Sequence, residues 1–213
     1  MSGIIVSGDT SGSVTLSAPA VSGSSVLTLP ASTDTLVGKA TTDTLTNKTL
    51  GSGTVMPAGS VIQVIQTLNN ANTTGSTIIP NDNTIPQISE GTQYLTCTIT
   101  PKSATSNLLV TVTLFISETA NNSNNGIVAL FRDATANALC AGYMGQSGSL
   151  FEQGSPSVLS FLTPASSTSS TTFTVRAGLD TAFALIMNSS AVGATPKLGG
   201  VYYSGITIME IAA

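Results

Sequence analysis

Apolar and polar residues alternate with a period of two over much of the chain after residue 60, and helical periodicity is nearly absent. In the clearest segment, residues 107–117, one face carries Leu108, Val110, Val112, Leu114 and Ile116. The other face carries Leu109 and Phe115 with two threonines, so we expect the core on one side and partly covered surface on the other. The other predicted strands are 61–67, 94–100, 126–132, 138–144, 157–162, 171–177, 182–187 and 201–211.

Clusters of Gly, Ser, Asn and Pro separate these segments, which is typical of an all-β domain. The sequence FRDATANA at residues 131–138 predicts a strand, a tight hairpin loop and a returning strand. Eight or nine strands over about 150 residues favour a jelly-roll β-sandwich.

Residues 1–57 have a different pattern. The VTL of residues 14–16 is echoed by LTL at 27–29, and the TDTL of residues 33–36 recurs at 42–45. Such short repeats have too few apolar residues for a core of their own, so we expect them to stack against copies on other chains. The sequence therefore predicts a short β-rich N-terminal segment, residues 1–57, followed by a jelly-roll knob domain, residues 58–213.

Charged residues make up only 8% of the chain, against roughly 25% in ordinary soluble domains. So little charge indicates that identical chains cover part of the surface, as in an obligate oligomer. The six Lys and Arg residues are scattered singly, which argues against nucleic-acid binding. No basic and apolar leader and no membrane-spanning run is visible, so we expect synthesis in a cytoplasm and no membrane insertion. Cys97 and Cys140 are then expected to be buried free thiols, although a disulfide between neighbouring strands stays open.

Three phrases of the sequence resemble bacteriophage fibre and spike proteins of the tail or head. The first is the VTL…APA and LTLPA pattern within residues 12–31, and the second is TLTNKTL at residues 44–50. The third is ITPKSATSNLLV at residues 99–110, followed in such proteins by an ALFRD sequence that is matched here at residues 129–133. These phrases occur in both halves of the chain and cover about a quarter of it; they are signatures of assembly and not of chemistry.

The resemblance implies a homotrimer, with a C-terminal jelly roll similar to tumour necrosis factor-like trimers. Its N-terminal part would join other virion proteins, and its C-terminal domain would project outward. The expected location is therefore the virion, on the tail or on the capsid surface, after synthesis in the bacterial host cytoplasm. Attachment to the host surface and decoration of the head are the two versions of this function that stay open.

Residue types needed for common catalytic and metal sites are missing. The chain has no histidine, which removes the usual general base and most zinc sites, and no phosphate-binding glycine motif occurs. Glu118 and Glu152 are the acid pair considered for glycoside hydrolysis, but ten acidic residues supply such pairs by chance. The NDN of residues 81–83 is a weak calcium loop, and an Asx-turn is the better interpretation. We therefore expect no enzyme activity, no metal and no cofactor.

Two polar loops are candidates for contact with a host-surface glycan: residues 119–125 and residues 145–156. Amide side chains donate and accept hydrogen bonds, which suits sugar hydroxyls. The alternatives are a solvated connection for the first loop and a subunit contact for the aromatic ring of the second. The candidate receptor-contact residues are Asn121, Asn122, Asn124, Asn125 and Phe151.

Two rival functions come from other classes of protein. A polysaccharide-degrading tailspike is disfavoured by the absent histidine, the few acids and the lack of a long parallel β-helix. A bacterial lectin or adhesin is disfavoured because no secretory signal is visible.

Overall fold

Antiparallel β-strands form the regular structure of the chain, which we describe from a computed structural model covering residues 3–17, 21, 24, 26, 31, 55–119, 124–144, 155–190 and 198–213. The chain divides into two units, Met1–Ser52 and Gly53–Ala213. This division lies a few residues before the expected boundary at residues 57 and 58. The described residues form no α-helix, so the all-β prediction is confirmed.

The described part of the first unit is a β-hairpin. Strand β1 (Gly3–Ser7) pairs antiparallel with β2 (Ser13–Ser17), and the turn is closed by a 3.0 Å hydrogen bond from the Gly8 amide to the Gly12 carbonyl. Ile4, Ile5 and Val6 are more than half exposed. A two-stranded hairpin with such exposure has no core of its own.

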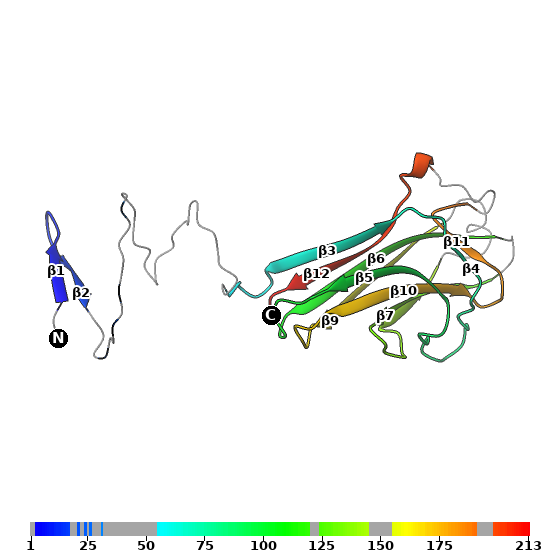
Figure 1. Cartoon of the computed structure of the whole chain (residues 1–213), viewed down its shortest axis with the longest axis horizontal. Helices are drawn as coiled ribbons and strands as arrows, with labels where there is room; N and C mark the ends of the chain where they lie inside the picture. Colours follow the sequence, from blue (N-terminus) through cyan, green and yellow to red (C-terminus); the bar gives the residue numbers. More distant parts are fainter. Residues whose placement is uncertain are drawn as a thin grey trace. The chain divides into compact units, whose positions relative to one another are not determined.

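The described residues of the second unit form ten strands and one short 3-10 turn, drawn in Figure 1 from cyan to red. The strands are β3 (Val61–Asn69), β4 (Thr74–Gly75), β5 (Thr92–Ile99), β6 (Asn107–Glu118), β7 (Gly126–Arg132), β8 (Cys140–Tyr143), β9 (Ser155–Pro164), β10 (Thr171–Leu179), β11 (Leu185–Met187) and β12 (Ser204–Ile211), and the turn is η1 (Leu198–Gly200).

These strands form two antiparallel sheets in a sandwich-like arrangement. The six-stranded sheet has the path β3-β12-β6-β9, and β3 and β12 run side by side in Figure 1. Ile116 of β6 pairs with Ser155 of β9 on one edge and with Met187 of β11 on the other, so β11 and its neighbour β4 continue the β12 side. The four-stranded sheet has the order β5-β10-β7-β8.

The main core lies between the two sheets and follows from the alternation of side chains along each strand. The alternation predicted for residues 107–117 is confirmed, because the five aliphatic residues of one face are fully buried, whereas Leu109 and Phe115 on the other face are half-buried. From β12, Ile206 and Ile208 join this core, and the opposite sheet contributes Leu130 and Phe173.

A second, smaller core lies on the outer face of the four-stranded sheet. The connection between β4 and β5 crosses this face and brings Ile79 against Ile127 and Phe131 of β7. Its backbone approaches so closely that a Cβ atom at Gly178 would lie 2.5 Å from the Thr77 carbonyl oxygen. The outer face of this sheet is therefore covered along β7 by the chain's own connection.

The two cysteines lie on opposite edges of the four-stranded sheet. Cys97 is on β5 and Cys140 is on β8, and two strands separate them, which corresponds to roughly 14 Å at the usual strand spacing. A disulfide requires Cα atoms within about 7 Å, so both thiols are free, as expected. Cys97 is buried and Cys140 is half-buried, and burial raises the pKa of the Cys140 thiol.

All nine strands predicted from the alternation are present, with shifts of up to three residues at their ends. The predicted hairpin is also confirmed: β7 and β8 pair antiparallel, and Asp133 in their connection has a positive φ of 51°. β1 and β2 lie in the N-terminal segment predicted to be β-rich, although their positions were not predicted, and β4 was not predicted at all. β4 is only two residues long, too short for any periodicity to show.

Candidate functional site

The predicted contact residues are only partly covered by the structure. Asn121, Asn122 and Phe151 lie outside the described residues. Asn124 is only 7% exposed, its amide donates to the Glu118 carboxylate, and its Oδ1 accepts a 2.8 Å hydrogen bond from Thr181 Oγ1. In this structure the Asn124 side chain is thus a buried support at the base of the loop and not an exposed contact.

Asn125 is exposed, but its polar groups are used within the chain. Its backbone N–H and its Nδ2 donate to the two carboxylate oxygens of Asp180, at 3.1 and 2.7 Å. The neighbouring residues Asn124 and Asn125 therefore tie the end of the 119–125 loop to the turn after β10.

Glu118, a member of the acid pair considered from the sequence, is the last residue of β6 and is fully buried. Its Oε2 has no hydrogen-bond partner among the described residues. Burial raises the pKa of Glu118, the hydrogen bond from Asn124 lowers it, and the charge of Asp180 raises it again, so the net shift is upward. Its considered partner, Glu152, lies outside the described residues.

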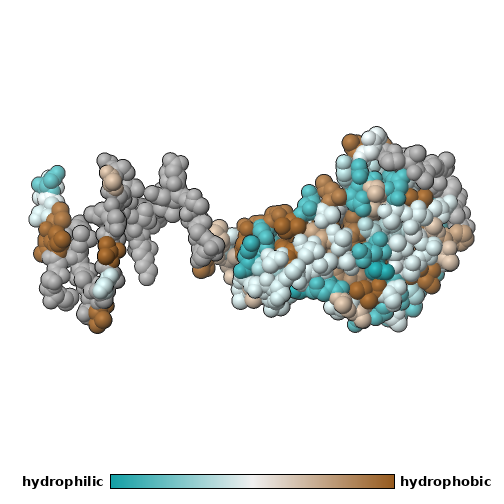
Figure 2. Space-filling view, in the orientation of Figure 1, coloured by the Kyte–Doolittle hydropathy of each residue, from teal (hydrophilic) through white to brown (hydrophobic). Residues whose placement is uncertain are grey.

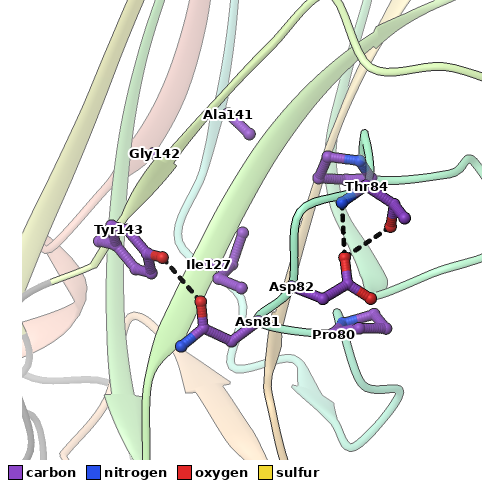
Figure 3. A pocket seen from close by; sticks show the side chains of 9 residues that line it. Pro80, Asn81, Asp82, Thr84, Ile127, Ala141, Gly142 and Tyr143 are labelled. Atoms are coloured by element: carbon purple, nitrogen blue, oxygen red, sulfur yellow. Dashed lines mark hydrogen bonds between the residues drawn. The ribbon is translucent and has the colours of Figure 1, made fainter.

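A cavity of about 200 Å³ lies between the β4–β5 connection and the outer face of β7 and β8 (Figure 3). Pro80, Asn81, Asp82, Thr84 and Pro86 line it from the connection. Ile127, Ala141, Gly142 and Tyr143 line it from the sheet. Pairing places Tyr143 opposite Ile127, so the two side chains share one face of the sheet.

Hydrogen bonds fix the polar groups of this cavity. The Tyr143 hydroxyl donates to Asn81 Oδ1 at 2.7 Å, and Figure 3 shows the two side chains pointing toward one another. Asp82 Oδ1 accepts from the Thr84 hydroxyl at 2.6 Å and from the Thr84 backbone N–H at 2.7 Å. These side-chain and backbone hydrogen bonds lower the pKa of Asp82, so its carboxylate is ionised at neutral pH.

The interpretation of residues 81–83 as an Asx-turn is confirmed by these bonds from Thr84 to Asp82. Within the described ranges, no group of three His, Cys, Asp or Glu residues is placed to hold a metal ion. The same residues include no helix that is long and apolar enough to cross a membrane. From the sequence, Asn81 and Asp82 were expected in an Asx-turn or, less well, in a weak calcium loop, and Tyr143 was not among the predicted site residues.

A second candidate surface is the outer face of the six-stranded sheet. The register places Val64, Met209, Leu109 and Leu162 in one row across β3, β12, β6 and β9. A parallel row contains Leu68, Gly205, Thr113 and Val158. The aliphatic side chains on the two edge strands are 53–63% exposed, and Figure 2 shows hydrophobic residues along β3.

This outer face carries no charged side chain in its paired rows. Between the two apolar rows lies a neutral polar row formed by Gln66, Thr207, Thr111 and Ser160. Gln66 Nε2 donates to Thr207 Oγ1 at 2.9 Å. The one acidic residue of β12, Glu210, points inward and is fully buried.

No family model and no curated protein matches the chain. Among solved structures, the C-terminal domain of EclA, a sugar-binding protein, matches 67% of this chain and 87% of its own length, with 16% identity and a TM-score of 0.35. The dimeric latent PorU from Porphyromonas gingivalis matches 76% of this chain, which corresponds to 14% of its own length, with 11% identity and a TM-score of 0.35. Similarity at this level says nothing about the function of this chain.

Proposed function

We propose that this chain is a structural virion protein that forms a homotrimeric bacteriophage fibre or spike and takes part in attachment to the host surface. In this proposal residues 1–57 join the virion and residues 58–213 form an outward-facing jelly-roll knob. The protein acts by assembly and recognition and is not an enzyme.

The observation that carries the proposal is the uncharged outer face of the six-stranded sheet. Four strands of about nine residues, spaced as strands usually are, present on the order of 500 Å². The exposed apolar side chains of this face form two rows on either side of a neutral polar row, and apolar residues gathered on one face often mark interaction sites. Identical chains are the partners that fit, because a neutral face has no charge to repel its own copy.

The strand order supports the jelly-roll assignment. Counted along the second unit without the short β4 and β11, the eight remaining strands lie in the orders 1-8-3-6 and 2-7-4-5. Among these eight strands, every connection except the β7–β8 hairpin passes from one sheet to the other. Two such interleaved four-stranded sheets fit a jelly roll, which combines two Greek keys.

The sequence phrases shared with phage fibres support the same proposal through their structural roles. The PKSATS phrase forms the loop that wraps the buried carboxylate of Glu210, with bonds from the Lys102 and Ser103 amides and the Ser106 hydroxyl. The RD of the ALFRD phrase ends β7 and begins the turn of the β7–β8 hairpin, where the Asp133 carboxylate accepts from the Thr172 amide at 2.8 Å. Both phrases thus stabilise the sandwich.

Light scattering of the purified protein tests the assembly. We expect about three times the 21.4 kDa chain mass. Val64→Lys or Leu162→Lys places a charge on the outer face of the six-stranded sheet and is expected to yield lighter species. Thr96→Lys, on an exposed position of β5 in the other sheet, is the matched control and should keep the full mass.

A monodisperse monomer of the unmodified protein at micromolar concentration would contradict the proposal. The virion role is tested separately by labelling particles with antibodies against the knob. Label on the tail supports host attachment, label on the capsid supports the decoration version, and purified particles without label refute a virion role.

A further inference from the structure

We propose that the cavity between the β4–β5 connection and β8 binds a single neutral sugar ring of a bacterial surface polysaccharide. The proposal concerns the cavity lined by Asn81, Asp82, Thr84 and Tyr143 (Figure 3). The source of the sugar, a host polysaccharide, rests on the proposed function, since a fibre that attaches to its host contacts that polysaccharide. The ability of the cavity to bind a sugar does not depend on the proposed function.

The first argument is the aromatic ring at the cavity. The Tyr143 side chain is 70% exposed, although β7 next to it is buried. Its hydroxyl is held by Asn81 at 2.7 Å, so the ring is oriented before any ligand arrives. An exposed, oriented ring offers an apolar face to the C–H groups of a sugar while its polar tip stays hydrogen-bonded.

The second argument is a donor on Asn81 and an acceptor on Asp82, two residues that line the cavity, that no described residue uses. Asn81 uses Oδ1 to accept from Tyr143, so its Nδ2 keeps both donor hydrogens, and no described residue accepts from them. Asp82 uses Oδ1 for Thr84, and its Oδ2 has no partner in the described part of the chain. Figure 3 shows the Asn81 amide directed toward Tyr143 and the Asp82 carboxylate directed toward Thr84, so each can bind a different hydroxyl group of one sugar ring.

The charge of the lining residues and the volume of the cavity limit the class of ligand that it can bind. None of the nine lining residues is basic and one, Asp82, is acidic, so the cavity repels uronic and sialic acids and accepts neutral sugars. The volume of about 200 Å³ lies below the roughly 300–1,000 Å³ of sites for larger ligands. One ring of a polysaccharide fits this size, with the rest of the polymer outside.

The position of the cavity agrees with assembly through the opposite face. The cavity lies on the outer side of the four-stranded sheet, whereas the uncharged face belongs to the six-stranded sheet. A trimer assembled through the uncharged face leaves three cavities open. Weak binding of one ring at each cavity then adds up when one polymer surface engages all three.

The test is saturation-transfer NMR on the full chain with glucose, galactose, mannose and N-acetylglucosamine, and with glucuronate as the anionic comparison. We expect transfer to at least one neutral sugar and none to glucuronate. Tyr143→Ala should weaken binding about two- to tenfold, as expected for loss of a stacking surface. Asp82→Asn should also weaken it, because the amide preserves the turn but loses the charge.

Two further variants keep the result interpretable. Tyr143→Phe retains the ring and should bind better than Tyr143→Ala. Tyr203→Ala removes a 42% exposed tyrosine outside the cavity and should bind like the unmodified protein. An unchanged light-scattering mass and melting temperature exclude misfolding of the Tyr143→Ala protein.

The proposal is overturned if no neutral sugar receives saturation, or if Tyr143→Ala and Asp82→Asn bind the sugar as well as the unmodified chain. Its failure is distinguishable from failure of the fibre assignment. A trimer found on particles but without sugar binding refutes the cavity alone. A monomer absent from particles whose sugar binding still depends on Tyr143 refutes the fibre assignment and supports the cavity.

Discussion

Replacing the buried Glu210 with glutamine is expected to lower the free energy of unfolding by about 3 kcal/mol. Glu210 lies at the end of β12 and has no solvent exposure. Its carboxylate accepts from Gln63 Nε2 at 2.6 Å, from Ser106 Oγ at 2.6 Å, from the Lys102 N–H at 2.9 Å and from the Ser103 N–H at 3.0 Å. One carboxylate therefore joins β3, the PKSATS loop and β12.

The magnitude follows from the number of donors. Oε1 accepts from Lys102, Ser103 and Ser106, whereas Oε2 accepts from Lys102 and Gln63. A glutamine oxygen at the Oε1 position therefore keeps three donors as uncharged bonds and turns its NH₂ group toward Gln63. One donor that loses its acceptor costs about 1–3 kcal/mol, and three bonds that lose a charged acceptor weaken by roughly 0.5 kcal/mol each, which together give about 3 kcal/mol. For a domain of about 150 residues this corresponds to a melting temperature lower by roughly 6–12 °C.

Urea denaturation at a fixed protein concentration measures the effect, because the stability of an oligomer depends on concentration. Glu90→Gln is the graded control, since the half-buried Glu90 carboxylate accepts only one backbone hydrogen bond, from Gln87 at 2.8 Å. If Glu210→Gln lowers the free energy of unfolding by less than about 1 kcal/mol, or by no more than Glu90→Gln does, the hydrogen bonds to Glu210 do not stabilise the fold as argued.

The pH dependence gives an independent check with a defined sign. Burial alone raises the pKa of Glu210, but the hydrogen bonds from Ser106, Lys102, Gln63 and Ser103 outweigh burial and lower it below 4.5. A lowered pKa in the folded state contributes stability that is present above the unfolded pKa and lost as pH falls through the folded pKa. The stability difference between the unmodified protein and Glu210→Gln should therefore shrink below pH 4.5.

Three further predictions concern other parts of the chain. Glu118→Gln should raise the urea midpoint at neutral pH. Burial raises the pKa of Glu118 in the folded state, so its contribution to stability is complete below the unfolded pKa and is lost as pH rises through the folded pKa. A neutral glutamine avoids the cost of burying the ionised carboxylate. Asn124→Ala should lower stability by about 1–2 kcal/mol by removing the partner of Glu118, and equal stability would contradict the buried role. A chain that begins at Pro57 should stay folded, as judged by circular dichroism, and should be missing from particles; normal occupancy would place attachment in the knob.

The strands were predictable because their pattern is local. In β6 every second side chain enters the core, and the same alternation is visible in the sequence from Leu108 to Ile116. The Asx-turn at Asp82 is also local, since its partner Thr84 is two residues away. By contrast, β1 and β2 form a hairpin whose apolar residues are exposed, so their sequence has no pattern of buried residues from which their positions could be predicted.

The candidate cavity was not predictable, because its parts are brought together from distant positions. Asn81 and Tyr143 are 62 positions apart, and they meet only because the β4–β5 connection crosses the outer face of β7. The prediction of Asn124 as an exposed contact residue was wrong for a different reason. Within a polar, Asn-rich run it gives no sign of burial, and its burial follows from the position of Glu118 at the end of β6.

The two outer faces of the sandwich differ in what covers them, and this difference connects assembly with recognition. Over the four-stranded sheet, the β4–β5 connection buries Ile79 against Phe131, and the edge of this cover forms the cavity beside Tyr143. Over the six-stranded sheet, Val64, Leu68 and Leu162 remain more than half exposed in rows without charge. Copies of the chain that cover this second face would remove its apolar surface from water and leave the cavity at the outside of the assembly. A charge placed at Val64 should therefore change the mass of the assembly without affecting sugar binding by a single cavity, whereas Tyr143→Ala should do the reverse.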